Sequence, residues 1–150
     1  MPVSLDDLDR SILNMLQDDS RMAYTTIGKE LGVSEGTVRY RVKNLVEQGV
    51  ILNFTTLLDP RKVGFPITGI LTAHIVAGSF DSVVEELKKI DEIHHMFQST
   101  GKFDLVIVAN TEDMGHLGEL KNEIETVEGI LDVELFANTN LVMVEPKIKL

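Results

Sequence analysis

The first 49 residues carry apolar side chains at the three- and four-residue intervals that are typical of amphipathic helices. The first apolar stripe consists of Leu8, Ile12, Leu13 and Leu16. Two carboxylates, Asp6 and Asp7, precede this stripe, and negative charge is favourable at the positive end of a helix dipole. The pattern therefore predicts a first helix over residues 6–18.

Two shorter helices are predicted next, and a four-residue connection separates them. Thr25 or Thr26 can cap the first of these, and Gly32 can end it because glycine readily adopts the left-handed conformation. Ser34 is the predicted cap of the second, which ends at Gly49. The inward stripe of this third helix consists of Val38, Val42 and Leu45. Three short helices joined in this way are typical of a helix-turn-helix.

Strand-like and helix-like periods alternate in the rest of the chain. Residues 50–58 are apolar and β-rich and predict a strand, which a turn at Asp59 and Pro60 closes. The other predicted elements are strands at 67–77, 93–99, 104–109, 133–136 and 141–144 and helices at 79–90 and 114–126. With the last two strands taken as one closing β region, the order is β-α-β-β-α-β, the ferredoxin-like arrangement.

The predicted class is therefore α+β with two domains. Residues 1–49 form a helix-turn-helix domain of winged-helix-like type, residues 50–64 a β-strand hinge, and residues 65–150 a ferredoxin-like domain. Helices cover only one face of a ferredoxin-like sheet. Because the predicted strands are rich in apolar residues, we expect a second protomer to cover the other face.

Composition limits the chemistry and the compartment. The chain has no cysteine, which excludes disulfides, thiolate nucleophiles and cysteine-based metal centres and suits a reducing cytoplasm. Its longest apolar run, residues 105–109, is far shorter than the roughly 20 residues of a membrane helix. We therefore expect a cytoplasmic protein with no membrane partner.

The net charge of −10 is unevenly distributed along the chain. Residues 65–150 hold six basic against fifteen acidic residues, and all arginines lie in the first 61 residues. Residues 34–46, in contrast, contain Arg39, Arg41 and Lys43 against Glu35 alone. A polyanion could therefore bind to this local basic segment and be repelled elsewhere.

The third predicted helix has the character of a DNA-reading helix. Bases in the major groove are read mainly by the N-terminal half of such a helix, and phosphates are contacted from its flanks. The base-facing candidates are Gly36, Thr37, Arg39 and Tyr40, and the other DNA-binding candidates are Thr25, Ser34, Lys43 and Asn44. Two alternatives stay open for Arg41: a phosphate contact or an internal ion pair with an acid of the first helix. A solvated helix that carries cations by chance is the simpler interpretation of the same pattern.

The histidines and paired carboxylates do not suggest an active site. His94 and His95 are adjacent in a predicted strand and would face opposite sides, so they could not bind the same ion. Glu85 and Glu86 belong to a solvated helix face. We expect no metal, no cofactor and no enzymatic activity.

Two motifs occur in the first 51 residues, an opening L-D-x-x-D-x-x-I-L at residues 5–13 and S-x-x-T-V-x-x-R-V-x-x-L-x-x-x-G-V-I at residues 34–51. In these motifs the sequence resembles the Lrp/AsnC, or feast-famine, transcription regulators. The C-terminal half is similar to the amino-acid-sensing domain of that family, including T-G-x-F-D at residues 100–104. The resemblance covers nearly the whole chain.

The resemblance implies a regulator that binds double-stranded DNA as a dimer paired through its sheets, and often dimers assembled into octamers or discs. It also implies a small effector, commonly an amino acid. The effector-binding candidates are Thr100, Gly101, Lys102, Phe103, Asp104 and Thr139. A plain hairpin turn in which Asp104 accepts local amide hydrogens is the simpler interpretation of the same residues.

The sequence is compatible with two other functions. Some siroheme decarboxylases resemble the same two-domain layout, although an acidic C-terminal half with no arginine is poorly suited to a multiply carboxylated macrocycle. A metabolite-binding or assembly module whose helix-turn-helix no longer contacts DNA is the third interpretation.

Overall fold

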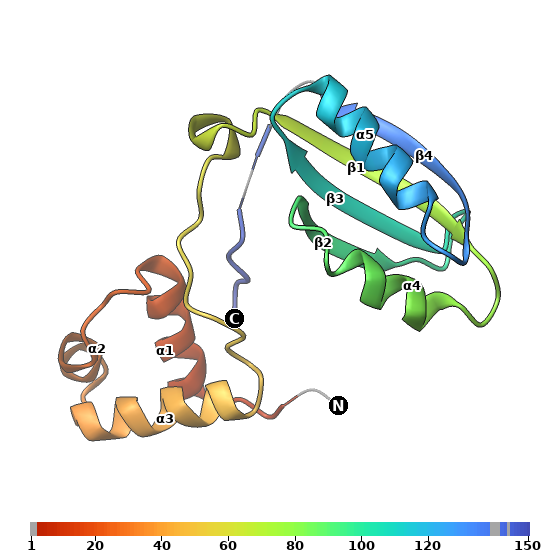
Figure 1. The fold of residues 1–150 in the computed structure, drawn as a ribbon. Coiled ribbons are helices and arrows are strands. Elements are labelled where there is room, and N and C mark those ends of the chain that lie inside the picture. The colour runs from red at the N-terminus through yellow and green to blue at the C-terminus, as the bar shows by residue number, and fades with distance from the viewer. Residues whose placement is uncertain (1–2, 139–141, 144) are drawn as a thin grey trace. The chain divides into compact units, whose positions relative to one another are not determined.

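Helices and strands follow one another in the computed structural model much as the periodicity predicts (Figure 1). The structure describes residues 3–138, 142–143 and 145–150. By their contacts these residues belong to two units, Met1–Leu57 with Met143–Leu150, and Leu58–Val142.

The N-terminal unit contains helices α1 (Asp7–Asp18), α2 (Tyr24–Leu31) and α3 (Glu35–Glu47). Its buried core consists of Ile12, Leu16, Ile27, Val38 and Val42. These side chains belong to the predicted apolar stripes of the three helices. The helix-turn-helix is therefore confirmed.

The ends of these helices are set by capping groups. Asp6 is the N-cap of α1 and forms a reciprocal capping box with Asp9. The Ser34 hydroxyl accepts a hydrogen bond from the Thr37 backbone N–H at 3.0 Å, which confirms the predicted cap of α3. Gly32 has a φ of +68° and ends α2, also as predicted.

The predicted cap of α2 is wrong. The N-cap is Ala23, which has no side-chain acceptor, and Thr25 and Thr26 lie within the first turn of the helix. A threonine one or two residues past the start cannot act as an N-cap, because the capping residue must have non-helical backbone angles.

The predicted strand at residues 50–58 is also wrong. All of these residues are described, and none belongs to a strand. Several of their large apolar side chains are nevertheless exposed, namely Leu52, Phe54, Leu57 and Leu58. A strand requires a neighbour that exchanges backbone hydrogen bonds, and no such neighbour pairs with this segment among the described residues of the chain.

The C-terminal unit contains a four-stranded antiparallel sheet in the order β2-β3-β1-β4. Its elements are β1 (Ile67–Ile75), α4 (Phe80–Leu87), β2 (Ile93–Gln98), β3 (Leu105–Thr111), α5 (Met114–Glu125) and β4 (Ile130–Asn138). This sequence of elements confirms the predicted β-α-β-β-α-β order and the α+β class. A one-turn 3₁₀ helix, Pro60–Val63, precedes β1.

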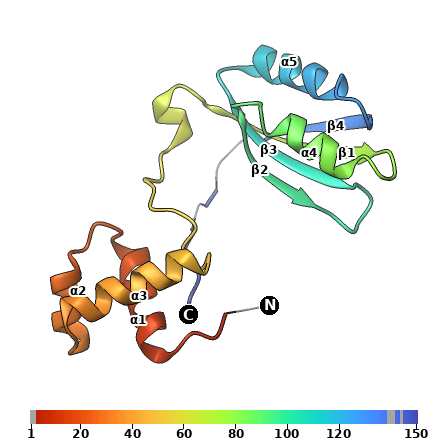
Figure 2. The same ribbon diagram turned by 60° about the horizontal axis from the view of Figure 1, so that its bottom comes forward.

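Both helices of this unit cover the same face of the sheet (Figure 2). Val83 and Leu87 of α4 and Leu117 and Ile124 of α5 are fully buried against it. The buried strand positions on this face include Leu71, Ala73, Leu105, Ile107 and Val133. The alternate positions of the strands form the opposite face, which these helices do not cover.

The closing β region differs in part from its prediction. The strand predicted at 133–136 is confirmed and is longer, running from Ile130 to Asn138. Of the strand predicted at 141–144, residues 141 and 144 lie outside the described residues, and residues 142–143 do not form a strand.

The last residues of the chain contact α1 of the N-terminal unit. The Gln17 side-chain amide donates to the Ile148 carbonyl at 3.0 Å and accepts from the Ile148 backbone N–H at 2.7 Å. The Lys147 ammonium contacts Asp18 in the same region. These contacts explain why residues 143–150 group with the helix-turn-helix.

Candidate functional site

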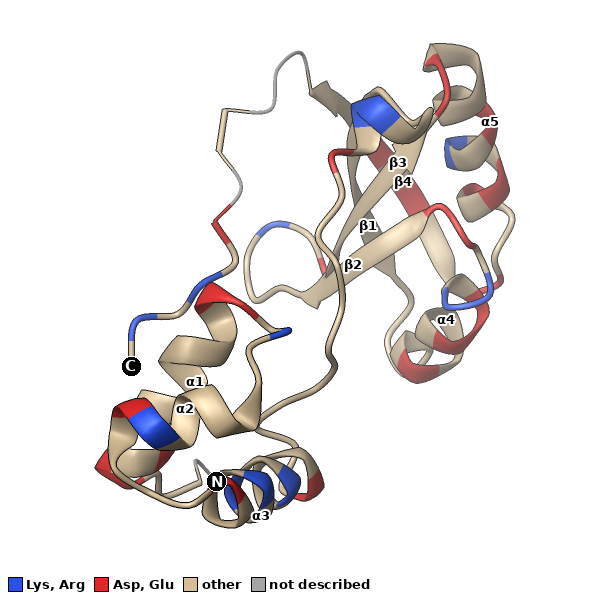
Figure 3. Cartoon of the chain, turned by 90° about the vertical axis from the view of Figure 1, so that its left-hand side faces the viewer, with Lys and Arg blue, Asp and Glu red and all other residues tan. Residues whose placement is uncertain are grey.

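The basic residues of the N-terminal unit are concentrated on α3. Figure 3 shows basic positions along the middle of this helix and acidic positions toward its two ends. These are the positions of Arg39, Arg41 and Lys43, with Glu35 at the start and Glu47 at the end. The structure thus places the basic segment predicted from the sequence on a single helix.

Arg39 is exposed and is held in place by two weak contacts. Its guanidinium contacts the Glu35 carboxylate one helical turn earlier and lies 5.5 Å from the centre of the Tyr24 ring of α2. Tyr24 was not among the predicted site residues, and its helical phase alone does not reveal a contact with another helix. Exposed ion pairs contribute little free energy, so Arg39 can exchange Glu35 for another anionic partner at low cost.

Of the other base-facing candidates, Gly36 and Tyr40 are accessible on the outer face of α3. The Tyr40 side chain is 63% exposed, and a side chain added at Gly36 would meet only the Ser34 hydroxyl, at 3.6 Å. Thr37 is half-buried, and its hydroxyl lies 2.8 Å from that of Ser34, so both hydroxyls already have a partner.

The predicted phosphate-facing residues lie at different places around the unit. Lys43 is exposed and lies 3.6 Å from Glu47, a weak surface pair. Thr25 is exposed in the first turn of α2. Asn44 is half-buried and lines a shallow hollow between α1 and α3 with Ser4 and Gln48. The structure therefore brings Lys43 to the outer face and turns Asn44 toward α1.

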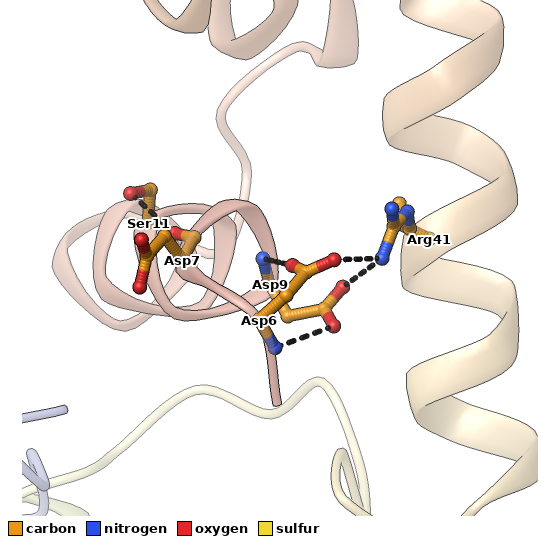
Figure 4. A network of polar contacts seen from close by, with 5 residues as sticks. All are labelled: Asp6, Asp7, Asp9, Ser11 and Arg41. Carbon is orange, nitrogen blue, oxygen red and sulfur yellow. Dashed lines mark hydrogen bonds and ion pairs between the residues drawn. The ribbon is translucent and has the colours of Figure 1, made fainter. Parts of the chain in front are cut away.

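Arg41 forms an internal ion pair, the second of its two predicted alternatives (Figure 4). Its Nη1 donates to Asp6 Oδ2 at 2.7 Å and to Asp9 Oδ1 at 3.2 Å. The backbone N–H of Asp9 and the Arg41 guanidinium both lower the pKa of the Asp6 carboxyl. The Asp6 carboxylate in turn raises the pKa of Arg41.

The turn at residues 100–104 joins β2 to β3, and its last residue is tied to the sheet. Asp104 Oδ2 accepts a hydrogen bond from the Ile75 backbone N–H at 2.8 Å, and the Asp104 N–H donates to the Ala73 carbonyl at 3.0 Å. His74 Nδ1 lies 3.7 Å from the same carboxylate. Asp104 therefore supports the conformation of the turn.

The other residues of the turn are more accessible. Thr100, Gly101 and Lys102 are exposed, and the Lys102 ammonium lies 3.0 Å from the Glu134 carboxylate of β4 and 4.6 Å from the centre of the Phe103 ring. Phe103 is half-buried. Thr139, the remaining effector candidate, lies outside the described residues.

The histidines are dispersed over the C-terminal unit. His94 and His95 are both exposed, and a register shift between Ile93 and His95 interrupts the regular pairing of β2 with β3. His116 contacts Glu92 at 3.1 Å. Within the described ranges, no group of three or more histidine or carboxylate side chains is placed to hold a metal ion. None of the described helices is long and apolar enough to cross a membrane.

Comparison with known proteins identifies both units. Residues 5–46 match the model of the AsnC-type helix-turn-helix domain, and residues 68–148 match that of the Lrp/AsnC ligand binding domain. An HTH-type transcriptional regulator of Methanocaldococcus jannaschii is 40% identical over 119 residues, covering 79% of this chain and 80% of the relative. The HTH-type transcriptional regulator FL11 of Pyrococcus furiosus is 34% identical over 128 residues, covering 83% and 85%.

Solved structures are similar to the chain over nearly all of its length. AsnC of Escherichia coli has a TM-score of 0.87 at 26% identity, with 98% of this chain and 99% of that chain covered. A transcriptional regulator of Neisseria meningitidis, solved as a complex with L-Met, has a TM-score of 0.86 at 20% identity, with 97% and 96% covered. The second likeness is one of fold alone.

These matches extend over both units and in the same order as the motifs of the sequence. The chain therefore belongs to the Lrp/AsnC family of transcriptional regulators, with a DNA-binding helix-turn-helix followed by a ligand-binding domain.

Proposed function

We propose that α3 enters the major groove of operator DNA and reads base edges with its N-terminal half. The observation that carries this proposal is the exposed face of α3, where Arg39, Tyr40 and Lys43 project from a chain with a net charge of −10. A groove-facing helix requires exposed donors for base edges and cations for phosphates. Gly36 and Thr37 are the other base-facing residues of this proposal, and Thr25 and Ser34 approach the sugar-phosphate backbone of the DNA. Asn44, which lies on the α1 side of α3, is a DNA contact only if its side chain turns outward.

In this proposal residues 1–49 bind DNA, residues 65–150 bind an effector and assemble, and residues 50–64 connect the two. A dimer would present two copies of α3 to successive major grooves about 34 Å apart, or to a multiple of that distance. The operator would therefore be pseudo-palindromic. Selection of bound fragments from a random DNA pool would give the half-site sequence and spacing directly.

Arg39 and Lys43 are expected to differ in how their loss affects binding. Arg39→Met should weaken binding to the selected operator about tenfold to a hundredfold and relax discrimination at one base pair, because a base contact is lost. Lys43→Met should weaken binding to all duplexes alike and lower the salt slope by about one, because only a phosphate contact is lost. Mobility-shift titrations at several salt concentrations measure both effects.

The matched control for these variants is Lys121→Met, which removes a cation from α5 of the C-terminal unit. Its operator affinity should stay close to that of the wild type. Equal operator affinities for Arg39→Met, Lys43→Met and the wild type would contradict the placement of α3 in the groove.

We further propose that the chain functions as a homodimer, or a larger assembly of dimers, in which the uncovered faces of two sheets pack together. Apolar side chains continue across this face: Ile70 of β1 lies opposite Val108 of β3 and Phe136 of β4. Phe97 of β2 lies opposite Val106. Phe97 and Phe136 are 55% and 48% exposed in the single chain, an unfavourable arrangement for a monomer in water.

The effector of this proposal is a small molecule, such as an amino acid, bound near residues 100–104. The exposed Gly101 permits a close approach, and Lys102 is a cation that can exchange Glu134 for a ligand carboxylate. The Neisseria meningitidis regulator solved with L-Met offers a precedent of the same fold.

An amino-acid effector should change operator affinity by linkage between its own site and the DNA site. Titration of each of the twenty amino acids, with and without operator, is expected to identify one whose affinity differs at least fivefold between the two conditions. Gly101→Val should abolish that difference and leave operator affinity without effector unchanged. Identical operator binding with all twenty would contradict the proposal.

A further inference from the structure

Arg41 lies on the side of α3 that faces α1, away from the outer face of the helix. Successive side chains on a helix are rotated by about 100°, so Arg41 lies roughly 60° from the direction of the buried Val38. Arg39 lies on the opposite flank, where it contacts Tyr24 of α2. The two arginines therefore differ in role: one borders the exposed face, and the other joins α3 to α1.

The contact of Arg41 with α1 is part of a closed network (Figure 4). Each of the two carboxylates uses one oxygen for the capping box and the other for Arg41. Asp6 Oδ1 accepts from the Asp9 N–H at 2.8 Å, and Asp9 Oδ2 accepts from the Asp6 N–H at 3.3 Å. Their remaining oxygens both accept from Arg41 Nη1. The residues that begin α1 thus also fix the middle of α3.

The charges of this network are unfavourable for a phosphate contact. Two carboxylates and one guanidinium carry a net charge of −1, so an approaching phosphate would be repelled. The Asp9 side chain is only 12% exposed and that of Arg41 33%, so the pair is partly shielded from solvent. Arg41 would have to leave two charge-assisted hydrogen bonds to reach DNA.

We propose that Arg41 is a positioning residue for DNA recognition, which through Asp6 and Asp9 fixes the rotation of α3 about its own axis. The inference rests on the DNA reading proposed above. A base contact requires a defined angle between side chain and base edge, whereas nonspecific attraction to phosphates tolerates rotation of the helix. Loss of the network should therefore reduce discrimination between sequences more than it reduces general affinity for DNA.

The test uses Asp6→Asn in the full chain, with Asp7→Asn as its matched control. Asparagine caps a helix as well as aspartate does, so α1 should keep its N-terminus while the ion pair loses its charge. Asp7 lies in the same turn, and its carboxylate does not contact Arg41 (Figure 4). Both variants remove one negative charge from the same helix end, so they have similar long-range effects on DNA.

The measured quantity is the dissociation constant for a scrambled duplex divided by that for the operator duplex of equal length. The operator duplex is the one that the wild-type chain enriches from a random pool. Each titration is repeated at several salt concentrations, at a temperature at which circular dichroism shows the variant to be folded.

Asp6→Asn is expected to lower the ratio about tenfold, mainly through weaker operator binding, and Asp7→Asn should keep the wild-type ratio. Arg41→Met should lower the ratio to a similar extent with an unchanged salt slope. The double variant, Asp6→Asn with Arg41→Met, should lose little more than Arg41→Met alone, because each of these variants breaks the ion pair between Asp6 and Arg41. A change in folding stability alone would not alter a ratio measured on fully folded protein.

Two results would overturn the proposal. If Arg41 contacts phosphate, Asp6→Asn should free it and tighten binding to both duplexes, and Arg41→Met should lower the salt slope by about one. Equal ratios for Asp6→Asn and Asp7→Asn would also exclude the positioning role. A wild-type chain that prefers no duplex would instead refute the proposed DNA reading itself, so the two failures are distinguishable.

Discussion

Replacing Gly28 with alanine is expected to destabilise the helix-turn-helix by about 2 to 3 kcal/mol, although alanine is the better helix former. Gly28 is buried in the middle of α2 and faces the turn that leads to α3. A Cβ atom at this position would lie 2.7 Å from the Val33 carbonyl oxygen and 3.3 Å from the Glu35 backbone nitrogen. Both neighbours are backbone atoms, so the clash can be relieved only by moving the turn or the start of α3.

The matched control is Gly118→Ala in α5, where an added Cβ would meet nothing within 4 Å. There the lower conformational entropy of alanine in the unfolded chain should stabilise the protein by about 0.5 to 1 kcal/mol. Hydrogen exchange of the amides of α1, α2 and α3 in urea, followed by mass spectrometry, measures the stability of the N-terminal unit separately from that of the C-terminal unit. Unchanged protection in Gly28→Ala would show that the turn can move at little cost.

Sequence periodicity correctly predicted the helices and strands whose apolar side chains are buried within a single unit. The stripes of α1 and α3 are regular, and Ser34 and Gly32 have side-chain and backbone properties that mark helix ends. The order of strands and helices in the C-terminal unit followed from the alternation of periods in the same way. Local pattern and global fold agree in these segments, as they do in most sequences that fold reliably.

The segment 50–58 shows where this reasoning fails. Apolar, β-rich residues predict the tendency to form a strand, but a strand exists only with a partner, and the pattern does not specify one. Local periodicity likewise does not show which residues far apart in the sequence contact each other. The contact of Gln17 with Ile148 is of this kind, because it joins the first helix to the end of the chain.

The candidate site could be predicted only in part, because local periodicity shows which side chains are exposed but not which distant residues they contact. The exposure of Arg39, Tyr40 and Lys43 follows from helical phase alone. For Arg41 the sequence left a phosphate and an acid of the first helix as alternative partners, since Asp6 lies 35 residues away in sequence and becomes a neighbour only after α1 packs on α3. Asp104 likewise accepts the N–H of Ile75, on a strand that the turn's own sequence cannot specify.

Replacing Phe136 with aspartate is expected to convert the proposed dimer into a monomer and to weaken operator binding about a hundredfold or more. Phe136 lies opposite Ile70 on the uncovered face of the sheet. A carboxylate there would have to be desolvated against apolar side chains of a second copy, which is costly without a partner charge. A monomer also loses the second recognition helix, whose binding is effectively intramolecular and contributes 10² to 10⁴ in affinity.

Light scattering after size-exclusion chromatography measures the mass, and mobility shift measures the affinity of the same samples. Met114→Asp is the matched control, because Met114 is 53% exposed at the start of α5, in the layer on the other side of the sheet. A carboxylate at that position is favourable for the helix dipole, so folding and the dimer should be retained. The Phe136 side chain is 48% exposed in the single chain, so the Phe136→Asp variant should also fold. A folded Phe136→Asp variant that still has twice the mass of the chain would place the dimer contact elsewhere than on this face.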